Sequence, residues 1–169
     1  WIRKNSKNKY DKEGFIARSG LSDVLTLNQA YENFNMNYRY ETSLDIKDFD
    51  IFFAKGLSLE NGAATITDFT AKLIADGIKF IHNKNQQHTN KWLVCGGGRK
   101  NKYLLECIKN NFKKLDLDPI ERFNIDGDFI ESQAFAFLAI RSLIGLPISF
   151  PSTTRCEKSS TGGVIVDNF

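Results

Sequence analysis

The most regular hydrophobic pattern along the chain lies between residues 58 and 81. Its apolar side chains recur at the spacing of a helix that buries one face. They are Ile66, Phe69, Leu73 and Phe80. Ser58 stands where an N-cap residue would precede this pattern. We therefore expect a helix from Ser58 to about Ile81, with its apolar pattern interrupted by Asp76.

Two shorter stretches have the same helical pattern. Residues 21–34 are expected to form a helix with Ser22 as its N-cap. Residues 99–112 are expected to form an amphipathic helix with one apolar stripe. This stripe consists of Tyr103, Leu104, Cys107, Ile108 and Phe112.

A fourth helix is predicted over residues 126–147, which are strongly apolar. Asp126 or Asp128 lies near its start, and the sequence Gly145-Leu146-Pro147 is typical of a helix end. Within it, residues 134–140 (AFAFLAI) alternate small and large apolar side chains. We expect this segment to be core and to pack closely on a sheet.

Two short segments have the length of strands, residues 91–95 (KWLVC) and 119–125 (PIERFNI). A strand–helix–strand unit of this length implies parallel pairing and an α/β fold. Two strands make too small a sheet. We therefore expect either further strands that the pattern hides, or a sheet that continues outside this chain.

Three consecutive glycines, Gly96, Gly97 and Gly98, separate the first strand from the next helix. Glycine permits positive φ and has no Cβ, so a ligand can lie against the backbone. Helix N-termini favour anionic groups, and α/β proteins bind ligands where parallel strands end. Asn101 could cap the helix or contact a sugar hydroxyl. The pattern matches neither GxGxxG nor GxxxxGK[ST], and a tight turn without a ligand is the alternative.

Composition narrows the class of protein. The 169 residues, 41% hydrophobic and 25% charged, suit one ordinary domain with its own core. The net charge of +3 permits a nucleotide, but the lysines are dispersed, so we expect no nucleic-acid partner. No apolar run reaches the roughly 20 residues that span a membrane, and we expect a cytoplasmic protein without a membrane partner.

The cysteines and histidines point to no metal site. The three cysteines form no CxxC pair, which argues against zinc and favours a reducing compartment. Cys95 is expected to be a buried cysteine at a strand end, because no histidine lies close in sequence to activate it. His82 and His88 lie in a polar stretch, and their spacing fits no common metal motif.

Five segments, in matching order, resemble the anhydro-N-acetylmuramic acid kinase family. This family lies within the superfamily of acetate and sugar kinases, Hsc70 and actin. The segments are WIRKNSKNKYDKEGFIARSG (1–20), GLSLENGAATITDFTAKLIADGI (56–78), VCGGGRKN (94–101), IESQAFAFLAIRSLIGLP (130–147) and PSTT (151–154). Together they cover most of the chain.

The resemblance implies a two-domain protein with RNase H-like (actin-like ATPase) domains around a cleft. Such a kinase uses ATP and Mg²⁺ to open the 1,6-anhydro ring with water and to phosphorylate O6, giving N-acetylmuramic acid 6-phosphate for cell-wall recycling. Only its C-terminal half is similar to this chain, which begins at Trp1. The phosphate loop and the aspartate base of a D-x-G-P-G-N loop are therefore expected upstream, and we expect no catalytic residue, no metal ligand and no independent activity here.

The resemblance also implies roles for individual residues. It assigns adenosine binding to Gly96–Gly98 with Asn101, and sugar binding to Glu131, which could instead complement a helix dipole. Arg141 is expected to pair with a carboxylate or to close its helix. The carboxylate pair in YDKEG (10–14) is expected to lie in a turn that docks onto the missing N-terminal domain.

We expect one domain over residues 1–169, made of entry elements (1–57), a nucleotide-binding core (58–147) and a C-terminal tail (148–169). Residues 37–48 depart from the family pattern, so any contact there is open. Two other functions remain: a non-catalytic nucleotide- or sugar-binding module, or a structural domain in which the glycines only turn the chain. A homodimer is suggested by the family alone, and the sequence leaves open whether the chain is a fragment, a truncation or part of a split gene.

Overall fold

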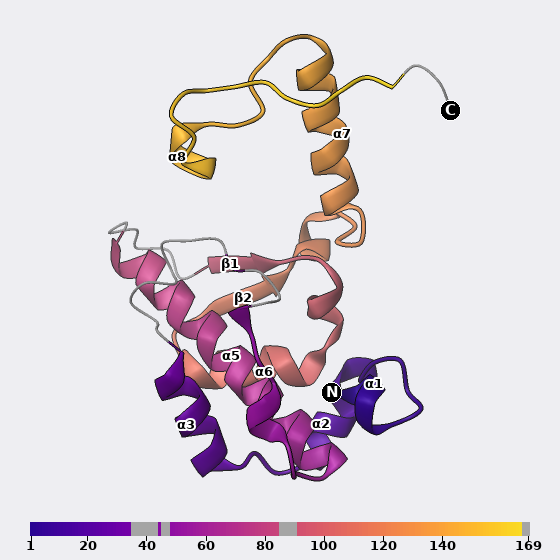
Figure 1. Cartoon of the computed structure of the whole chain (residues 1–169), viewed down its shortest axis with the longest axis vertical. Coiled ribbons are helices and arrows are strands. Elements are labelled where there is room, and N and C mark those ends of the chain that lie inside the picture. The colour runs from indigo at the N-terminus through magenta and orange to yellow at the C-terminus, as the bar shows by residue number, and fades with distance from the viewer. Residues whose placement is uncertain (35–43, 45–47, 85–90, 167–169) are drawn as a thin grey trace. The chain divides into compact units, whose positions relative to one another are not determined.

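A computed structural model describes residues 1–34, 44, 48–84 and 91–166 of the chain (Figure 1). It is helix-rich and contains a small parallel sheet, in agreement with the predicted α/β class. The chain divides into two compact units, Trp1–Pro119 and Ile120–Phe169, and each is described by itself. The segment 37–48 falls outside the described residues except for Leu44 and Asp48.

The first unit opens with short helices and then a long one. Two 3-10 turns, Lys12–Gly14 and Phe52–Ala54, lie between them. The helices are α1 (Ile2–Asn5), α2 (Phe15–Ser19), α3 (Val24–Asn33) and α5 (Leu59–Lys84).

The start of α5 is as predicted, since the Ser58 hydroxyl accepts a hydrogen bond from the Asn61 N–H at 3.1 Å. The helix runs to Lys84, three residues beyond the predicted end. The prediction of Ser22 as the cap of α3 was wrong. Asp23 takes this place, and its Oδ1 accepts the Thr26 N–H at 2.8 Å. A carboxylate at an N-cap also favours the positive end of the helix dipole.

The sheet consists of β1 (Lys91–Val94) and β2 (Asp116–Pro119), which pair in parallel with Lys91 opposite Asp116. Helix α6 (Lys102–Asn111) connects them. The predicted second strand at 119–125 was wrong, because residues 120–123 form a 3-10 turn. The second strand lies instead in a stretch where buried and more exposed side chains alternate, and Leu115 and Leu117 are its buried residues.

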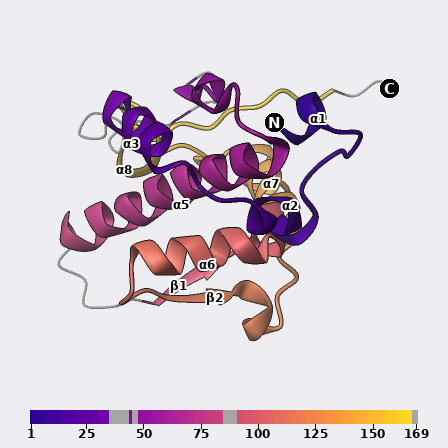
Figure 2. The same ribbon diagram turned by 90° about the horizontal axis from the view of Figure 1, so that it is seen from below.

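One core cluster of this unit lies between the sheet and helices α5 and α6. Figure 2 shows α5 and α6 on the same side of the strands. The buried cluster contains Ala71, Ile78, Cys107, Ile108, Leu115 and Leu117. The predicted stripe of α6 is confirmed, since its remaining members Tyr103, Leu104 and Phe112 pack against this cluster.

Cys95 is exposed, so the prediction of a buried cysteine was wrong. Side chains alternate between the two faces of a strand. Trp92 and Val94 pack on the core, whereas Lys91 and Leu93 are exposed. Cys95 follows Val94 and continues this alternation as an exposed residue.

The second unit contains α7 (Ile130–Leu143) and the short α8 (Pro151–Thr154). α7 begins four residues later than predicted, because the Asp126 carboxylate accepts the Asp128 N–H at 2.9 Å and holds a local turn. Its end is as predicted. Gly145 has φ 74°, and the Leu146 N–H donates to the Arg141 carbonyl at 2.8 Å, as in a Schellman motif.

Arg141 closes this helix, as expected, since its Nε donates to the Pro147 carbonyl at 2.8 Å. The expectation that residues 134–140 are core was wrong. No residue of α7 is buried, and 68% of the Phe135 surface is exposed. The described residues of this unit include no strand on which the helix could pack.

Candidate functional site

The three glycines form a tight turn between β1 and α6. Gly96 has φ 74° and ψ 179°, a backbone conformation that is almost restricted to glycine. Residues Gly97–Lys100 then form one 3-10 turn. The turn is held by Arg99, whose Nη1 donates to the Gly96 carbonyl at 2.9 Å, and by the Asn101 N–H, which donates to the Gly98 carbonyl at 3.0 Å.

All three glycines face open space. A Cβ built at Gly96, Gly97 or Gly98 meets no heavy atom within 4 Å. Backbone geometry requires glycine at Gly96, but Gly97 and Gly98 have no such positive φ. Neither packing nor backbone strain therefore explains glycine at these two positions. An exposed backbone flanked by the cations of Arg99 and Lys100 is suited to an anionic or polar ligand.

Asn101 fulfils one of its two predicted roles, since its Oδ1 accepts the Leu104 N–H at 3.0 Å and caps α6. A contact with a ligand would fall to the amide nitrogen of the same side chain. Asn101 also borders a cavity of about 480 Å³ beside the N-terminal segment. The other polar residues that line this cavity include Arg3, Lys9, Asp11 and Thr67.

The N-terminal loop packs closely behind this turn. Gly14 has φ 77°, and a Cβ there would overlap the side chain of Asn101. Both carboxylate oxygens of Asp11 accept backbone N–H groups, from Ile16 at 2.8 Å and Ala17 at 2.9 Å, and so cap α2. The sequence does contain a signal for this cap, an aspartate placed a few residues before a short helix, and it was missed.

Glu13 forms an ion pair with Lys102 on the first turn of α6, at 2.6 Å. The hydrogen bond and charge of Lys102 lower the pKa of Glu13. Arg18 and Glu106 form a second pair at 2.6 Å. These pairs join Glu13 and helix α2 to α6, and Asp11 caps α2, so both carboxylates have structural contacts in this unit. Docking of the loop onto a further domain stays a prediction.

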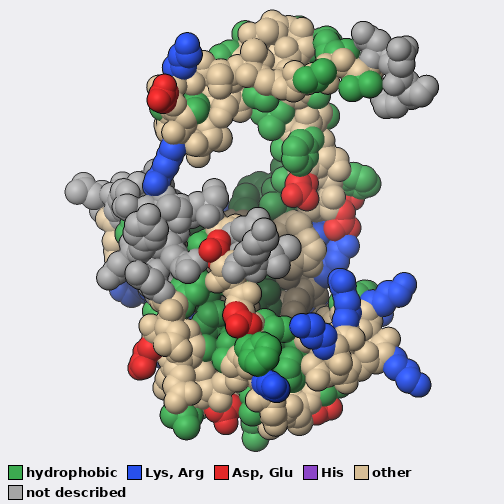
Figure 3. Space-filling model, viewed as in Figure 1, with side chains coloured by type: hydrophobic (Ala, Val, Ile, Leu, Met, Phe, Trp, Pro, Cys, Tyr) green, Lys and Arg blue, Asp and Glu red, His purple; other side chains and the backbone are tan. Residues whose placement is uncertain are grey.

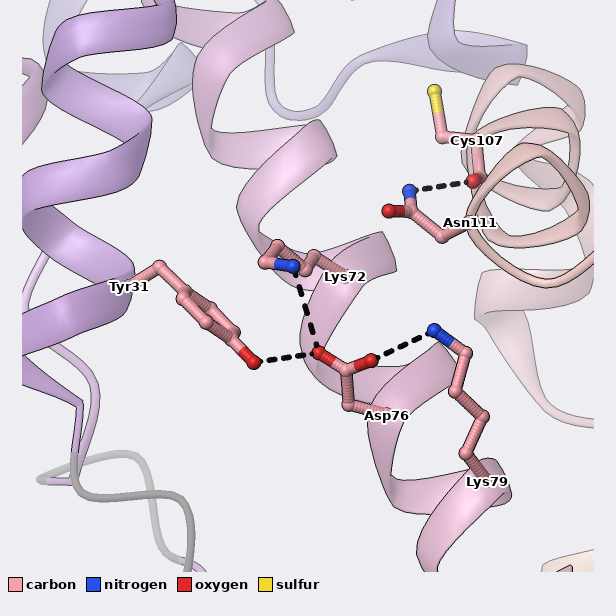
Figure 4. A network of polar contacts seen from close by, with 6 residues as sticks. All are labelled: Tyr31, Lys72, Asp76, Lys79, Cys107 and Asn111. Atoms are coloured by element: carbon pink, nitrogen blue, oxygen red, sulfur yellow. Dashed lines mark hydrogen bonds and ion pairs between the residues drawn. The ribbon is translucent and has the colours of Figure 1, made fainter.

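A polar network lies apart from the glycines, between α3 and α5 (Figure 4). The Tyr31 hydroxyl donates to Asp76 at 2.8 Å, and Lys79 donates to Asp76 at 2.9 Å. Lys72 lies 3.7 Å from the same carboxylate and 4.0 Å from the Tyr31 ring centre. The network explains why Asp76 interrupts an apolar pattern, and its role is to join two helices.

The contacts of this network change the pKa values of two of its residues. Burial alone would raise the pKa of Asp76, but hydrogen bonds from Lys79 and Tyr31 and the nearby lysine charges outweigh burial and lower it. Burial and the Asp76 hydrogen bond raise the pKa of Tyr31 to about 12. A charged carboxylate and a neutral phenol are therefore the stable pair at neutral pH.

Glu131 is exposed in the first turn of α7, where no side chain caps the helix. Its carboxylate can complement the helix dipole and can accept hydrogen bonds from a ligand. It belongs to the second unit, so it is described separately from the glycine turn.

In the part of the chain that the structure describes, no group of three or more His, Cys, Asp or Glu side chains could hold a metal ion. No helix in the described ranges is both long and apolar enough to cross a membrane.

Comparisons with known proteins agree on one family. The family model for anhydro-N-acetylmuramic acid kinase matches residues 1–168. Proteins of that name from Pelagibacter ubique and Zymomonas mobilis are 46% and 35% identical to this chain, over 100% and 98% of its length. One from Rhodospirillum rubrum is 36% identical over 96%. The chain spans 46%, 44% and 42% of these three proteins, respectively, which is less than half of each.

Proposed function

The chain belongs to the anhydro-N-acetylmuramic acid kinase family, and on this premise we propose that it forms the C-terminal half of an ATP-dependent sugar kinase. The reaction opens the 1,6-anhydro ring of the sugar with water and transfers the terminal phosphoryl group of ATP to O6. The products are N-acetylmuramic acid 6-phosphate and ADP, and the reaction serves cell-wall recycling in the cytoplasm. The match over residues 1–168 is the observation that carries this proposal.

Adenosine is bound at the turn formed by Gly96, Gly97 and Gly98. The proposal is supported by the open space over all three residues, which lets a ligand approach the backbone. The side-chain oxygen of Asn101 caps α6, and we expect its amide nitrogen to donate to a ribose hydroxyl. The turn follows directly on β1, as expected of a ligand site in an RNase H-like domain whose sheet continues in the other half.

Glu131 contributes to the muramyl sugar site. Sugar hydroxyls are hydrogen-bond donors, and a carboxylate can accept two or more of them. Glu131 is exposed in the first turn of α7, so its carboxylate is available to a ligand. The length and rigidity of this helix would hold that carboxylate in a constant position.

Catalysis is divided between this chain and the other half of the protein. Phosphoryl transfer depends mainly on positioning and on stabilising charge. Magnesium, when bound with ATP, neutralises phosphate charge. Most contacts to the metal are expected from the other half. That half also supplies the phosphate loop and the base, and closure of the two halves excludes bulk water.

A turnover assay tests this division. The chain alone is incubated with ATP, Mg²⁺ and the anhydro-sugar, and the sugar 6-phosphate is measured by mass spectrometry. A parallel reaction adds the part of the Pelagibacter ubique relative that lies outside the matched region, expressed as a separate polypeptide. We expect no product from the chain alone and product from the mixture. Turnover by the chain alone would refute the proposal that it is half of the active site.

A further inference from the structure

The loop before α2 contains two consecutive residues with positive φ. Glu13 has φ 54° and ψ 8°, and Gly14 has φ 77° and ψ 23°. A residue other than glycine keeps this conformation only where its surroundings enforce it, and such strain is common at functional sites. Glu13 is held by its ion pair with Lys102, at 2.6 Å, on the first turn of α6. The loop is therefore fixed against the helix that follows the glycine turn.

Gly14 is buried and lies against the side chain of Asn101. A Cβ at position 14 would overlap Asn101 Oδ1, and it would lie 3.1 Å from Asn101 Cγ and 2.7 Å from Tyr103 Cβ. The Asn101 oxygen cannot move away without losing the hydrogen bond from the Leu104 N–H at 3.0 Å. Only glycine at position 14 therefore permits this placement of the Asn101 side chain.

The same contacts determine where the Asn101 amide nitrogen lies. A backbone N–H can donate only to the oxygen of an asparagine side chain, so the Leu104 hydrogen bond fixes which end of the amide caps the helix. The nitrogen lies at the other end, and none of the described residues accepts a hydrogen bond from it. Asn101 is thus held in one orientation and keeps a hydrogen-bond donor that a ligand can use.

The cavity that Asn101 borders has basic walls. Arg3, Lys4 and Lys9 line it, and residues 1–12 contain five Lys or Arg side chains but only one Asp. That residue, Asp11, already accepts two backbone N–H groups. Figure 3 shows basic side chains gathered around the N-terminal segment, where Figure 1 places α1. Positive charge on these walls attracts an anionic ligand, such as a nucleotide, toward the Asn101 amide.

We propose that Gly14 is a positioning residue of the nucleotide site. It acts through Asn101, because the space that Gly14 leaves lets Asn101 cap α6 with its oxygen and direct its nitrogen to a ribose hydroxyl. The ion pair of Glu13 with Lys102 keeps Gly14 next to the start of α6. This inference rests on the proposed adenosine site and extends that site to a loop that lies far from the three glycines in sequence.

The test is a calorimetric titration of the full chain with ADP and Mg²⁺. Asn101→Ser keeps a side chain that can cap α6 but removes the amide, so it should weaken ADP binding by about three- to tenfold, the effect of one lost hydrogen bond. Gly14→Ala should weaken ADP binding by a similar factor, because the new methyl group displaces the Asn101 amide.

Gly56→Ala is the matched control. Gly56 has φ 94°, so alanine is strained there as it is at Gly14, but a Cβ at Gly56 meets no heavy atom within 4 Å. Gly56→Ala should bind ADP as tightly as the wild-type chain. Circular dichroism checks that each variant is folded, and urea unfolding compares the stability that the two glycine variants lose.

A double variant separates positioning from a general loss of structure. Gly14→Ala combined with Asn101→Ser should bind ADP within about twofold of Asn101→Ser alone, because the side chain through which Gly14 acts is already gone. A purely structural role of Gly14 would instead weaken binding by the same factor in both backgrounds.

Nitrogen-15 relaxation of the wild-type chain gives a second readout, which does not depend on whether Gly14→Ala folds. Without ADP, the side-chain amide of Asn101 should be as rigid as the backbone, with an order parameter of about 0.85. Its signals should shift when ADP binds. An order parameter below about 0.6 would show a mobile amide and would overturn the proposal.

Two results of the titrations would also overturn it. One is wild-type affinity for ADP in a folded Gly14→Ala variant, and the other is the same loss of affinity from Gly14→Ala with and without Asn101→Ser. If Asn101→Ser weakens ADP binding and Gly14→Ala does not, the nucleotide site stands and only the role of Gly14 is refuted. If the folded wild-type chain binds no ADP, the nucleotide site is refuted together with this inference.

Discussion

Alanine substitutions at two adjacent glycines should have different effects on stability. Gly96 has φ 74° and ψ 179°, where an alanine Cβ is strained by about 1–3 kcal/mol. Gly97 lies in the 3-10 turn without positive φ, and a Cβ there meets nothing within 4 Å. Gly97→Ala should therefore be neutral or stabilise by up to about 1 kcal/mol, through the entropy of the unfolded chain.

Urea unfolding followed by tryptophan fluorescence measures both variants. Trp92 lies in β1, three residues before Cys95 and the glycine turn, so its emission reports on this part of the fold. We expect a lower midpoint for Gly96→Ala and an unchanged or higher one for Gly97→Ala, with equal slopes. If Gly97→Ala destabilised the chain as much as Gly96→Ala, the open space over the turn would be wrong, and the glycines would serve packing.

Three further predictions follow from side-chain contacts. Asp11→Ala should cost about 1 kcal/mol in urea unfolding, because two α2 N–H groups lose their acceptors; Asp11→Asn should cost less. The pKa of Asp76 lies below its ordinary value of 3.8. The charged carboxylate therefore stabilises the folded chain at neutral pH, and this contribution should be lost as the pH falls below about 4. Asp76→Asn should remove this part of the loss of stability at low pH. If the free energy of unfolding depended on pH in the same way in both proteins, the network would be contradicted. Iodoacetamide should label exposed Cys95 quickly and Cys107 slowly, as measured by peptide mass spectrometry. Cys107 is buried, and burial and a hydrogen bond with Asp68 raise the pKa of its thiol to about 12. Faster labelling of Cys107 than of Cys95 would contradict these exposures.

The helices could be predicted from sequence because apolar spacing and N-caps act locally. Ser58 and Asn101 cap their helices as their positions indicate. The strand β2 was missed because two aspartates alternate with Leu115 and Leu117, so the segment has no apolar run. Alternation alone was the available signal.

Burial was harder to predict, because it depends on what covers a side chain. Cys95 and the phenylalanines of α7 have the composition of core, yet they are exposed in a chain that spans less than half of its relatives. The tight turn was readable from the three glycines, but the open space above them was not. The ion pair of Glu13 with Lys102 joins residues distant in sequence, so no local pattern could reveal it.

A calorimetric titration of this chain with ADP and Mg²⁺ tests the nucleotide site most directly. The account predicts saturable binding that Gly97→Asp abolishes, because an acidic side chain would occupy the open space and repel the phosphates. Gly97→Asp should remain folded by circular dichroism, since its Cβ meets no neighbour. Binding that survives in Gly97→Asp, or no binding by the folded wild-type chain, would contradict a nucleotide site formed by these glycines and leave the turn a purely structural one.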